Sequence, residues 1–354
     1  MLVFCDAVLP ATMACSTRHA RTRRLNLVVR YFITLLVAAI GHASSANDDT
    51  ASAVSVSAVA RVFIVTSEEG SASHDRFIAA VDAGLRAVAN VTVLPENRAQ
   101  AVLATQKQVS EPRALAIVVG TRAALALCTK PLTVPLLLTL IPSPTYYETI
   151  AARCSENKNR TAVLFLDQPL ARQVAAMKLA FPNSSHFTVL LGPEARAQGP
   201  RIENLAARRG WRATLINIDS VDEVFTALER RAEHNRPLLA VPDALVFNSK
   251  TASHILLAAY RYGIPVVGYS ESYVNAGALL AVYSKPEQLA QQAADAARQY
   301  LTAEDNALPE PSFPKYFSLA INQQVGRSLG LALPDENTLL NELLRDEDDD
   351  HEPP

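Results

Sequence analysis

Few residues in this sequence have the types and spacing that catalysis needs. Gly268-Tyr269-Ser270-Glu271-Ser272 begins like the Gly-x-Ser-x-Gly elbow that exposes a nucleophilic serine, but the second glycine is missing. The sequence also lacks a phosphate-binding P-loop and a dinucleotide glycine fingerprint. Metal spacing such as His-Glu-x-x-His is absent around His74, His186, His234 and His254. We therefore predict that the chain is not an enzyme and needs no cofactor or metal, with an esterase built on Ser270 as the least favoured alternative.

Polar side chains instead recur where predicted strands end. In an open parallel sheet, ligands sit beyond the carboxyl ends of the strands, so these side chains are candidates for ligand binding, although each one alone is as often a helix cap or turn residue. Amides near Thr121 and Ser143 suit a carboxylate, and Asp243 suits an amino group. Tyr146, Tyr147 and Tyr273 are candidates to stack on an apolar or aromatic ligand. The predicted site consists of Ser67, Thr121, Ser143, Asp167, Asp243, Ser270 and Asn275.

The elements that must position these residues alternate between strand and helix along most of the chain. This alternation predicts an α/β fold with parallel sheets covered on both faces, arranged as two lobes. The late strand at 278–283 is expected to return to the first sheet, which would make the lobes discontinuous. The first series of strands is predicted at 62–66, 91–94, 114–119 and 135–140, and the second at 162–166, 187–191, 212–218, 238–241 and 264–268.

The N-terminus has the order of a secretory signal. Four arginines between Arg18 and Arg24 precede an apolar run at 28–40, and small residues follow at 41–46. A membrane anchor is a weaker reading because the uninterrupted apolar part is too short for a bilayer core of about 30 Å. Thr22-Arg23-Arg24 leaves a twin-arginine route open, and Met13 is an alternative start. We predict a signal peptide at 1–46, a linker at 47–60 and a periplasmic mature protein.

Composition and cysteine content further narrow the class of protein to which the chain can belong. With 354 residues, 49% of them hydrophobic, and a net charge of −2, the chain can bury sizeable cores and lacks the basic stripe of a nucleic-acid-binding protein. After loss of the leader, only Cys128 and Cys154 remain, and the sequence leaves open whether they form a disulfide. The acidic end at 346–354 is predicted to be disordered.

Several segments resemble the ABC-transporter substrate-binding protein family with the type I periplasmic binding fold. The resemblance is carried by Val241-Pro242-Asp243, Phe247-Asn248-Ser249, Tyr260-Arg261, Ile264-Pro265-Val266, Gly268-Tyr269-Ser270, Ala276-Gly277-Ala278-Leu279, the segment from Asp167 to Gln173, Leu191-Gly192-Pro193 and the segment from Pro314 to Asn322. It implies two Rossmann-like lobes joined by three hinge crossings. The expected lobes are 61–160 plus 276–333 and 161–275, followed by a C-terminal extension at 334–354.

The resemblance also implies a function. It suggests a monomeric binding protein that captures a small metabolite, such as an amino acid or aromatic compound, and delivers it to an ABC permease in the inner membrane. Its members line their cleft at positions that match Thr121, Ser143, Asp243 and Ser270. The loop at 67–75 is shorter than the family's usual form, which leaves the ligand class open. The alternative is a periplasmic sensor or receptor partner with the same fold and no role in transport.

Overall fold

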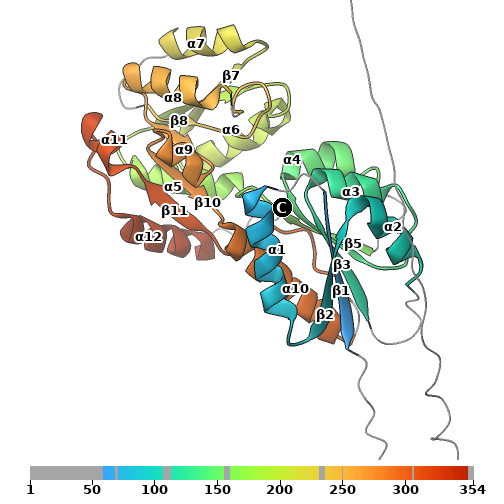
Figure 1. Ribbon diagram of the computed structural model, residues 1–354. Helices are drawn as coiled ribbons and strands as arrows, with labels where there is room; N and C mark the ends of the chain where they lie inside the picture. The colour runs from blue at the N-terminus through green and yellow to red at the C-terminus, as the bar shows by residue number, and fades with distance from the viewer. Residues whose placement is uncertain are drawn as a thin grey trace, which may run out of the picture. The chain divides into compact units, whose positions relative to one another are not determined.

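The computed structural model describes residues 59–67, 71–106, 113–154, 160–230, 236–248, 250–304 and 307–349 (Figure 1). The predicted signal peptide, and the linker up to residue 58, lie outside these residues. Across the ranges given, no helix is both long and apolar enough to cross a membrane.

The first sheet contains five parallel strands in the order β2-β1-β3-β4-β5. Along β1, Val62 and Ile64 face one core while Phe63 and Val65 face another, as the two-residue period of a strand requires. Both faces are therefore buried, as expected for a parallel sheet. The strands are β1 (Ala60–Thr66), β2 (Ala89–Pro95), β3 (Ala114–Val119), β4 (Leu136–Ile141) and β5 (Thr161–Phe165).

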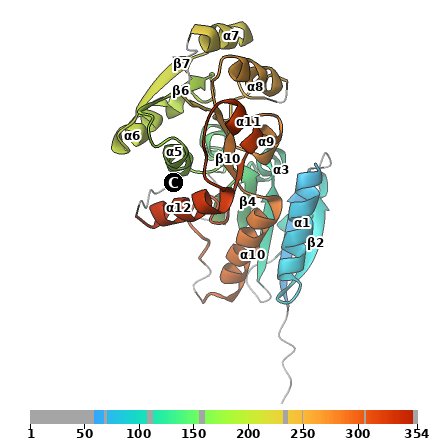
Figure 2. The same cartoon turned by 90° about the vertical axis from the view of Figure 1, so that its left-hand side faces the viewer.

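Helices cover both faces of this sheet. Helices α1 (Ala72–Leu85) and α10 (Pro286–Thr302) lie side by side on one face, although some 200 residues of sequence separate them (Figures 1 and 2). Gly84 permits this close packing, because a Cβ there would lie 3.1 Å from the Cβ of Ala294. The other face is covered by α2 (Glu96–Ala104), α3 (Thr121–Cys128) and the segment formed by α4 (Ser143–Thr145) and the π-helix η1 (Tyr146–Ile150).

The second sheet contains six strands in the order β11-β10-β9-β8-β6-β7, and only β11 runs antiparallel to its neighbour. The strands are β6 (His186–Leu191), β7 (Arg212–Asn217), β8 (Leu238–Leu239), β9 (Val266–Gly268), β10 (Leu280–Tyr283) and β11 (Ser318–Ile321). One face packs on α5 (Leu170–Ala180), α6 (Gly199–Arg208) and α12 (Glu336–Asp349), and the other on α7 (Val221–Arg230), α8 (Ala252–Arg261) and α9 (Glu271–Asn275). The short elements η3 (Arg196–Gln198) and α11 (Gln323–Ser328) complete the chain. The predicted α/β fold with two parallel-sheet lobes is confirmed.

The boundaries between the lobes differ from the predicted ones. Strand β5 belongs to the first sheet, where it pairs with β4, so the second lobe does not begin at residue 161. Strand β10 pairs with β9 and β11, so 276–333 does not return as a whole to the first lobe. Within that range, α10 packs on the first sheet, and Ser312 forms a bridge with Leu164 of β5. The chain therefore passes between the sheets three times, at 166–169, 284–285 and 313–317.

The C-terminal helix corrects another expectation. Residues 346–349 are helical rather than disordered, because α12 continues to Asp349. Leu339 and Leu343 of this helix are fully buried against the core of the second lobe. Near the C-terminal end of this helix, Asp346 forms an ion pair of 2.7 Å with Arg209. The predicted extension is thus an integral part of the second lobe up to this point, and 350–354 lie outside the described residues.

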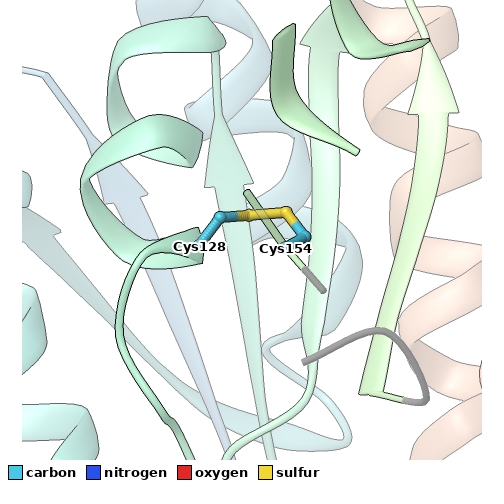
Figure 3. The surroundings of a disulfide bond; sticks show 2 residues. All are labelled: Cys128 and Cys154. Atoms are coloured by element: carbon cyan, nitrogen blue, oxygen red, sulfur yellow. A yellow bond between two sulfur atoms is a disulfide. The ribbon is translucent and has the colours of Figure 1, made fainter. Parts of the chain in front are cut away.

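The structure also answers the question of the two cysteines. Cys128 at the end of α3 and Cys154 after η1 form a disulfide, with their Cα atoms 4.4 Å apart (Figure 3). Both side chains are buried in the core of the first lobe. The bond closes a loop of 26 residues that contains β4 and Ser143, and in the chain-entropy model such a bond stabilises the fold by roughly 3 kcal/mol.

Candidate ligand-binding site

A pocket of about 510 Å³ lies among residues from both lobes. The first lobe contributes the start of α1 and the ends of β4 and β5, and the second contributes the start of α9 and the end of β10. The crossing at 284–285 and the start of α10 complete the wall. The lining residues are Ser71, Ser73, His74, Arg76, Leu140, Leu166, Ser270, Glu271, Ser272, Tyr283, Ser284, Lys285, Pro286 and Leu289.

Leu140, which lines this pocket, has an unusual backbone conformation. Its φ of 55° lies in the left-handed region, and within the described ranges no other residue besides glycine has a positive φ. The pairing of β4 with β5 shifts register between Thr139 and Ile141, so Leu140 forms a bulge that points it away from the regular ladder. Strained residues of this kind are concentrated at functional sites. Nothing in the identity of a leucine signals this conformation, so it could not be predicted from the sequence.

The first turn of α1 forms one polar wall. Ser71 caps the helix by accepting a hydrogen bond from the His74 backbone N–H at 3.4 Å. The His74 ring packs over Gly120, where a Cβ would lie 3.5 Å from His74 Cε1. Arg76 forms an exposed ion pair of 3.7 Å with Glu287 of α10. Ser71 and Ser73, from the segment at 67–75, line the pocket, while 68–70 lie outside the described residues.

Of the seven predicted site residues, Ser270 lines the pocket. It caps α9, because its Oγ accepts a hydrogen bond from the Tyr273 N–H at 3.4 Å. Beside it, the Tyr283 hydroxyl interacts with Glu271. Burial, together with the hydrogen bond to Glu271, raises the pKa of Tyr283 to about 12. Tyr283 therefore stays protonated as a hydrogen-bond donor at neutral pH.

Ser143 and Asp167 lie together at the ends of β4 and β5. The Asp167 carboxylate accepts hydrogen bonds from the Ser143 N–H and from its hydroxyl, both at 2.6 Å. Burial raises the pKa of Asp167, although both Ser143 bonds and the nearby charge of Arg201 oppose that rise. Ser143 and Asp167 therefore bind each other and join the ends of β4 and β5.

Asp243 makes hydrogen bonds within the second lobe. Its Oδ1 accepts from the N–H groups of Leu245 (2.8 Å) and Val246 (3.1 Å), and its Oδ2 accepts from the N–H of Ala195 (3.0 Å). The side chain is buried, and a Cβ at Gly192 would lie 2.1 Å from Asp243 Oδ1. The carboxylate therefore ties the loop after β6 to the loop after β8.

The other predicted residues are spread along the same strand ends. Ser67 follows β1 and is buried, and Thr121 is the first residue of α3. Asn275 ends α9 and lines a second pocket of about 350 Å³ beside β11 and α12. None of the three lines the first pocket. Ser67 and Thr121 nevertheless follow β1 and β3 at the carboxyl edge of the first sheet, where Leu140 and Leu166 also lie.

The aromatic candidates have different environments. Tyr273 is buried, and its hydroxyl lies 2.9 Å from that of Tyr269, so it belongs to the core. Tyr146 and Tyr147 pack edge to face, with ring centroids 5.2 Å apart. Tyr147 is accessible to a ligand because 53% of its surface is exposed, whereas Tyr273 is buried and is not accessible.

Comparison with solved structures supports the fold. The ligand-free, open structure of a substrate binding protein with adhesive properties from Clostridium difficile matches with a TM-score of 0.63 and 16% identity, over 78% of this chain and 97% of that chain. A conserved domain protein from Vibrio cholerae matches with a TM-score of 0.53 and 20% identity, over 80% and 98% of the respective chains. A Streptococcus pneumonia ABC domain in complex with L-Trp matches with a TM-score of 0.53 and 16% identity, over 80% and 98%.

At these identities the solved structures show a shared fold. No curated protein sequence matches the chain. The family model described as ABC transporter substrate binding protein matches residues 82–342, which is most of the sequence and includes parts of both lobes. The family binds small molecules outside the cytoplasm and works with ABC transporters. The chain therefore belongs to the ABC transporter substrate binding protein family.

Proposed function

We propose that this protein is the periplasmic solute-binding component of an ABC uptake system. It captures a small metabolite between its lobes and delivers it to a permease in the inner membrane. The observation that carries the proposal is the pocket of about 510 Å³, to which both lobes contribute side chains at the carboxyl ends of their strands. A solute held there touches both lobes, so it stabilises a closed arrangement over an open one.

The lining favours a small metabolite with both polar and apolar parts. Hydroxyl groups come from both lobes, for example from Ser73 and Ser272, and Leu140 and Leu166 supply apolar surface. Charged groups of both signs, including Lys285 and Glu271, are present for an ionised ligand. An amino acid fits this mixture, and the exposed ring of Tyr147 in η1, outside the pocket lining, suits an aromatic one that extends beyond the pocket.

We further propose that some of the predicted site residues contact the ligand and that others support the loops around it. Ser270 contacts the ligand directly, and Ser67, Thr121 and Asn275 approach it when the lobes close. Ser143, Asp167 and Asp243 shape the loops around it, because their polar atoms already bind each other or backbone amides. No cofactor or metal takes part in this scheme.

A thermal-shift screen tests the proposal. The purified protein is mixed with amino acids, sugars and small carboxylates, and a ligand at 100 times its Kd is expected to stabilise the fold by about 2.7 kcal/mol. The hit is then tested on Ser270→Ala, which removes one hydroxyl from the pocket, and on Ser328→Ala, whose hydroxyl bonds only to Val325 O of its own helix. The Ser270→Ala shift should shrink and the Ser328→Ala shift should not. Equal loss in both variants, or no hit in any class, would count against the proposal.

A further inference from the structure

One hydroxyl connects all three segments that carry the chain between the sheets. In the first crossing, Gln168 Nε2 donates a hydrogen bond to Ser284 Oγ in the second crossing at 2.8 Å. Ser284 Oγ in turn donates to the carbonyl oxygen of Tyr316 in the third crossing at 2.6 Å. One residue of each crossing therefore belongs to a single chain of hydrogen bonds.

A buried arginine ties this chain to the second lobe. Arg172 of α5 donates through Nη1 to Gln168 Oε1 at 2.5 Å and to the carbonyl oxygen of Pro314 at 2.7 Å. Its guanidinium carbon also lies 4.0 Å from the centroid of the Phe317 ring. Gln168 is 3% exposed and Arg172 is 8% exposed, so breaking these hydrogen bonds would be costly.

Two glutamines of α10, a helix that packs on the first sheet, form hydrogen bonds with the third crossing. Gln292 donates to the carbonyl oxygen of Phe313 at 3.1 Å and accepts from the Lys315 N–H at 2.6 Å. Gln288 donates to the carbonyl oxygen of Phe317 at 3.0 Å. Successive residues of this crossing are thus held by groups from both lobes.

Proline restricts each crossing further. Pro169 follows Gln168 directly, and Pro286 lies two residues after Ser284. In the third crossing, the carbonyl oxygen of Pro314 accepts the hydrogen bond from Arg172. Because each ring fixes φ near −65°, the backbone beside each of these contacts has little torsional freedom. A rotation that separated the crossings would break the bond from Gln168 to Ser284 and the bond from Arg172 to the Pro314 carbonyl, where both side chains are buried.

We infer that Gln168, Arg172, Ser284 and the Tyr316 carbonyl form a hinge clasp about which the two lobes rotate. Ser284 also lines the pocket, so a ligand there contacts the group that aligns the crossings. After one bond accepted and one donated, its hydroxyl retains a lone pair for such a contact. Ser284 and Gln168 are positioning residues in this scheme. The inference rests on the proposed function, since it assumes lobes that close on a solute.

Pulsed electron spin resonance on the ligand-free protein tests the clasp. One spin label is placed on each lobe through Arg98→Cys and Glu203→Cys, both at exposed positions, in a background with Cys5→Ser and Cys15→Ser and with the native disulfide intact. The distribution of label–label distances is measured in this parent and in Ser284→Ala, Ser284→Thr, Gln168→Ala and Ser272→Ala. Ser272 is the matched control because it lines the same pocket without a bond to the crossings.

We expect Ser284→Ala and Gln168→Ala to broaden the distribution at least twofold, while Ser284→Thr and Ser272→Ala keep the parental width. A parental width in Ser284→Ala would overturn the clasp, as would equal broadening in Ser272→Ala. Ser284→Ala removes one oxygen from a half-buried side chain and is the decisive variant if Gln168→Ala does not fold. The measurement needs no ligand, so its outcome is independent of the solute screen.

Discussion

The two lobes hold the loops at their strand ends in different ways. In the first lobe, the disulfide between Cys128 and Cys154 and the bonds between Ser143 and Asp167 fix the segment after β4. In the second lobe, the carboxylate of Asp243 joins two loops through three backbone amides. The carboxylates of Asp167 and Asp243 thus stabilise loops in both lobes, and the pocket itself is lined mainly by hydroxyl, charged and apolar side chains.

The largest effect is expected in the second lobe. Asp243→Ala leaves three amides without their acceptor and removes a buried carboxylate, so the free energy of unfolding should fall by about 4 kcal/mol. Denaturant titration measures this loss. Asp219→Ala provides the control, because Asp219 is an exposed partner of Arg196 at the end of β7. Weaker solute binding with unchanged stability would instead make Asp243 a direct ligand contact.

The next effect belongs to the first lobe. Replacing both cysteines, Cys128→Ala and Cys154→Ala, reopens a loop of 26 residues and should lower the free energy of unfolding by roughly 3 kcal/mol. Treating the parent with a reductant strong enough to open the bond should give a similar loss and leave the double variant unaffected. If reduction destabilises the double variant as much as the parent, the first lobe does not depend on this bond.

The smallest effect is a dependence on pH. Burial raises the pKa of Asp167 above its ordinary value of 3.8, so the folded protein holds this proton more tightly than the unfolded chain does. Stability contributed by this proton is fully present below 3.8 and is lost as pH rises through the raised pKa. Stability curves of the parent and Asp167→Asn should differ in slope across that window. Parallel curves would show that the Ser143 bonds cancel the effect of burial.

The sequence predicts the fold well because its signals are local. Alternation of short apolar runs with helical patterns identifies the strands of both sheets except β11. The same pattern does not indicate which sheet β10 joins, because Leu280 and Val282 would be buried in either one. Pairing with β9 and β11 decides this, and such pairing depends on contacts between distant segments.

The site is harder to predict because its partners lie far apart in the chain. Asp243 was correctly placed at a strand end, but one of its partners, Ala195, is 48 residues away. Ser284 was missed altogether, since its bonds reach residues 116 and 32 positions away. Leu140 is strained by the bulge between β4 and β5, and that conformation has no counterpart in its residue type.

Calorimetric titration of the best solute against one variant from each lobe tests the central claim most directly. Ser73→Ala alters the first wall of the pocket, and Ser270→Ala alters the second. If the solute bridges the lobes, each variant loses a hydrogen bond worth about 1 kcal/mol, and the Kd should rise about fivefold in both. Unchanged affinity in both, or a loss confined to one lobe, would contradict capture of the solute between them.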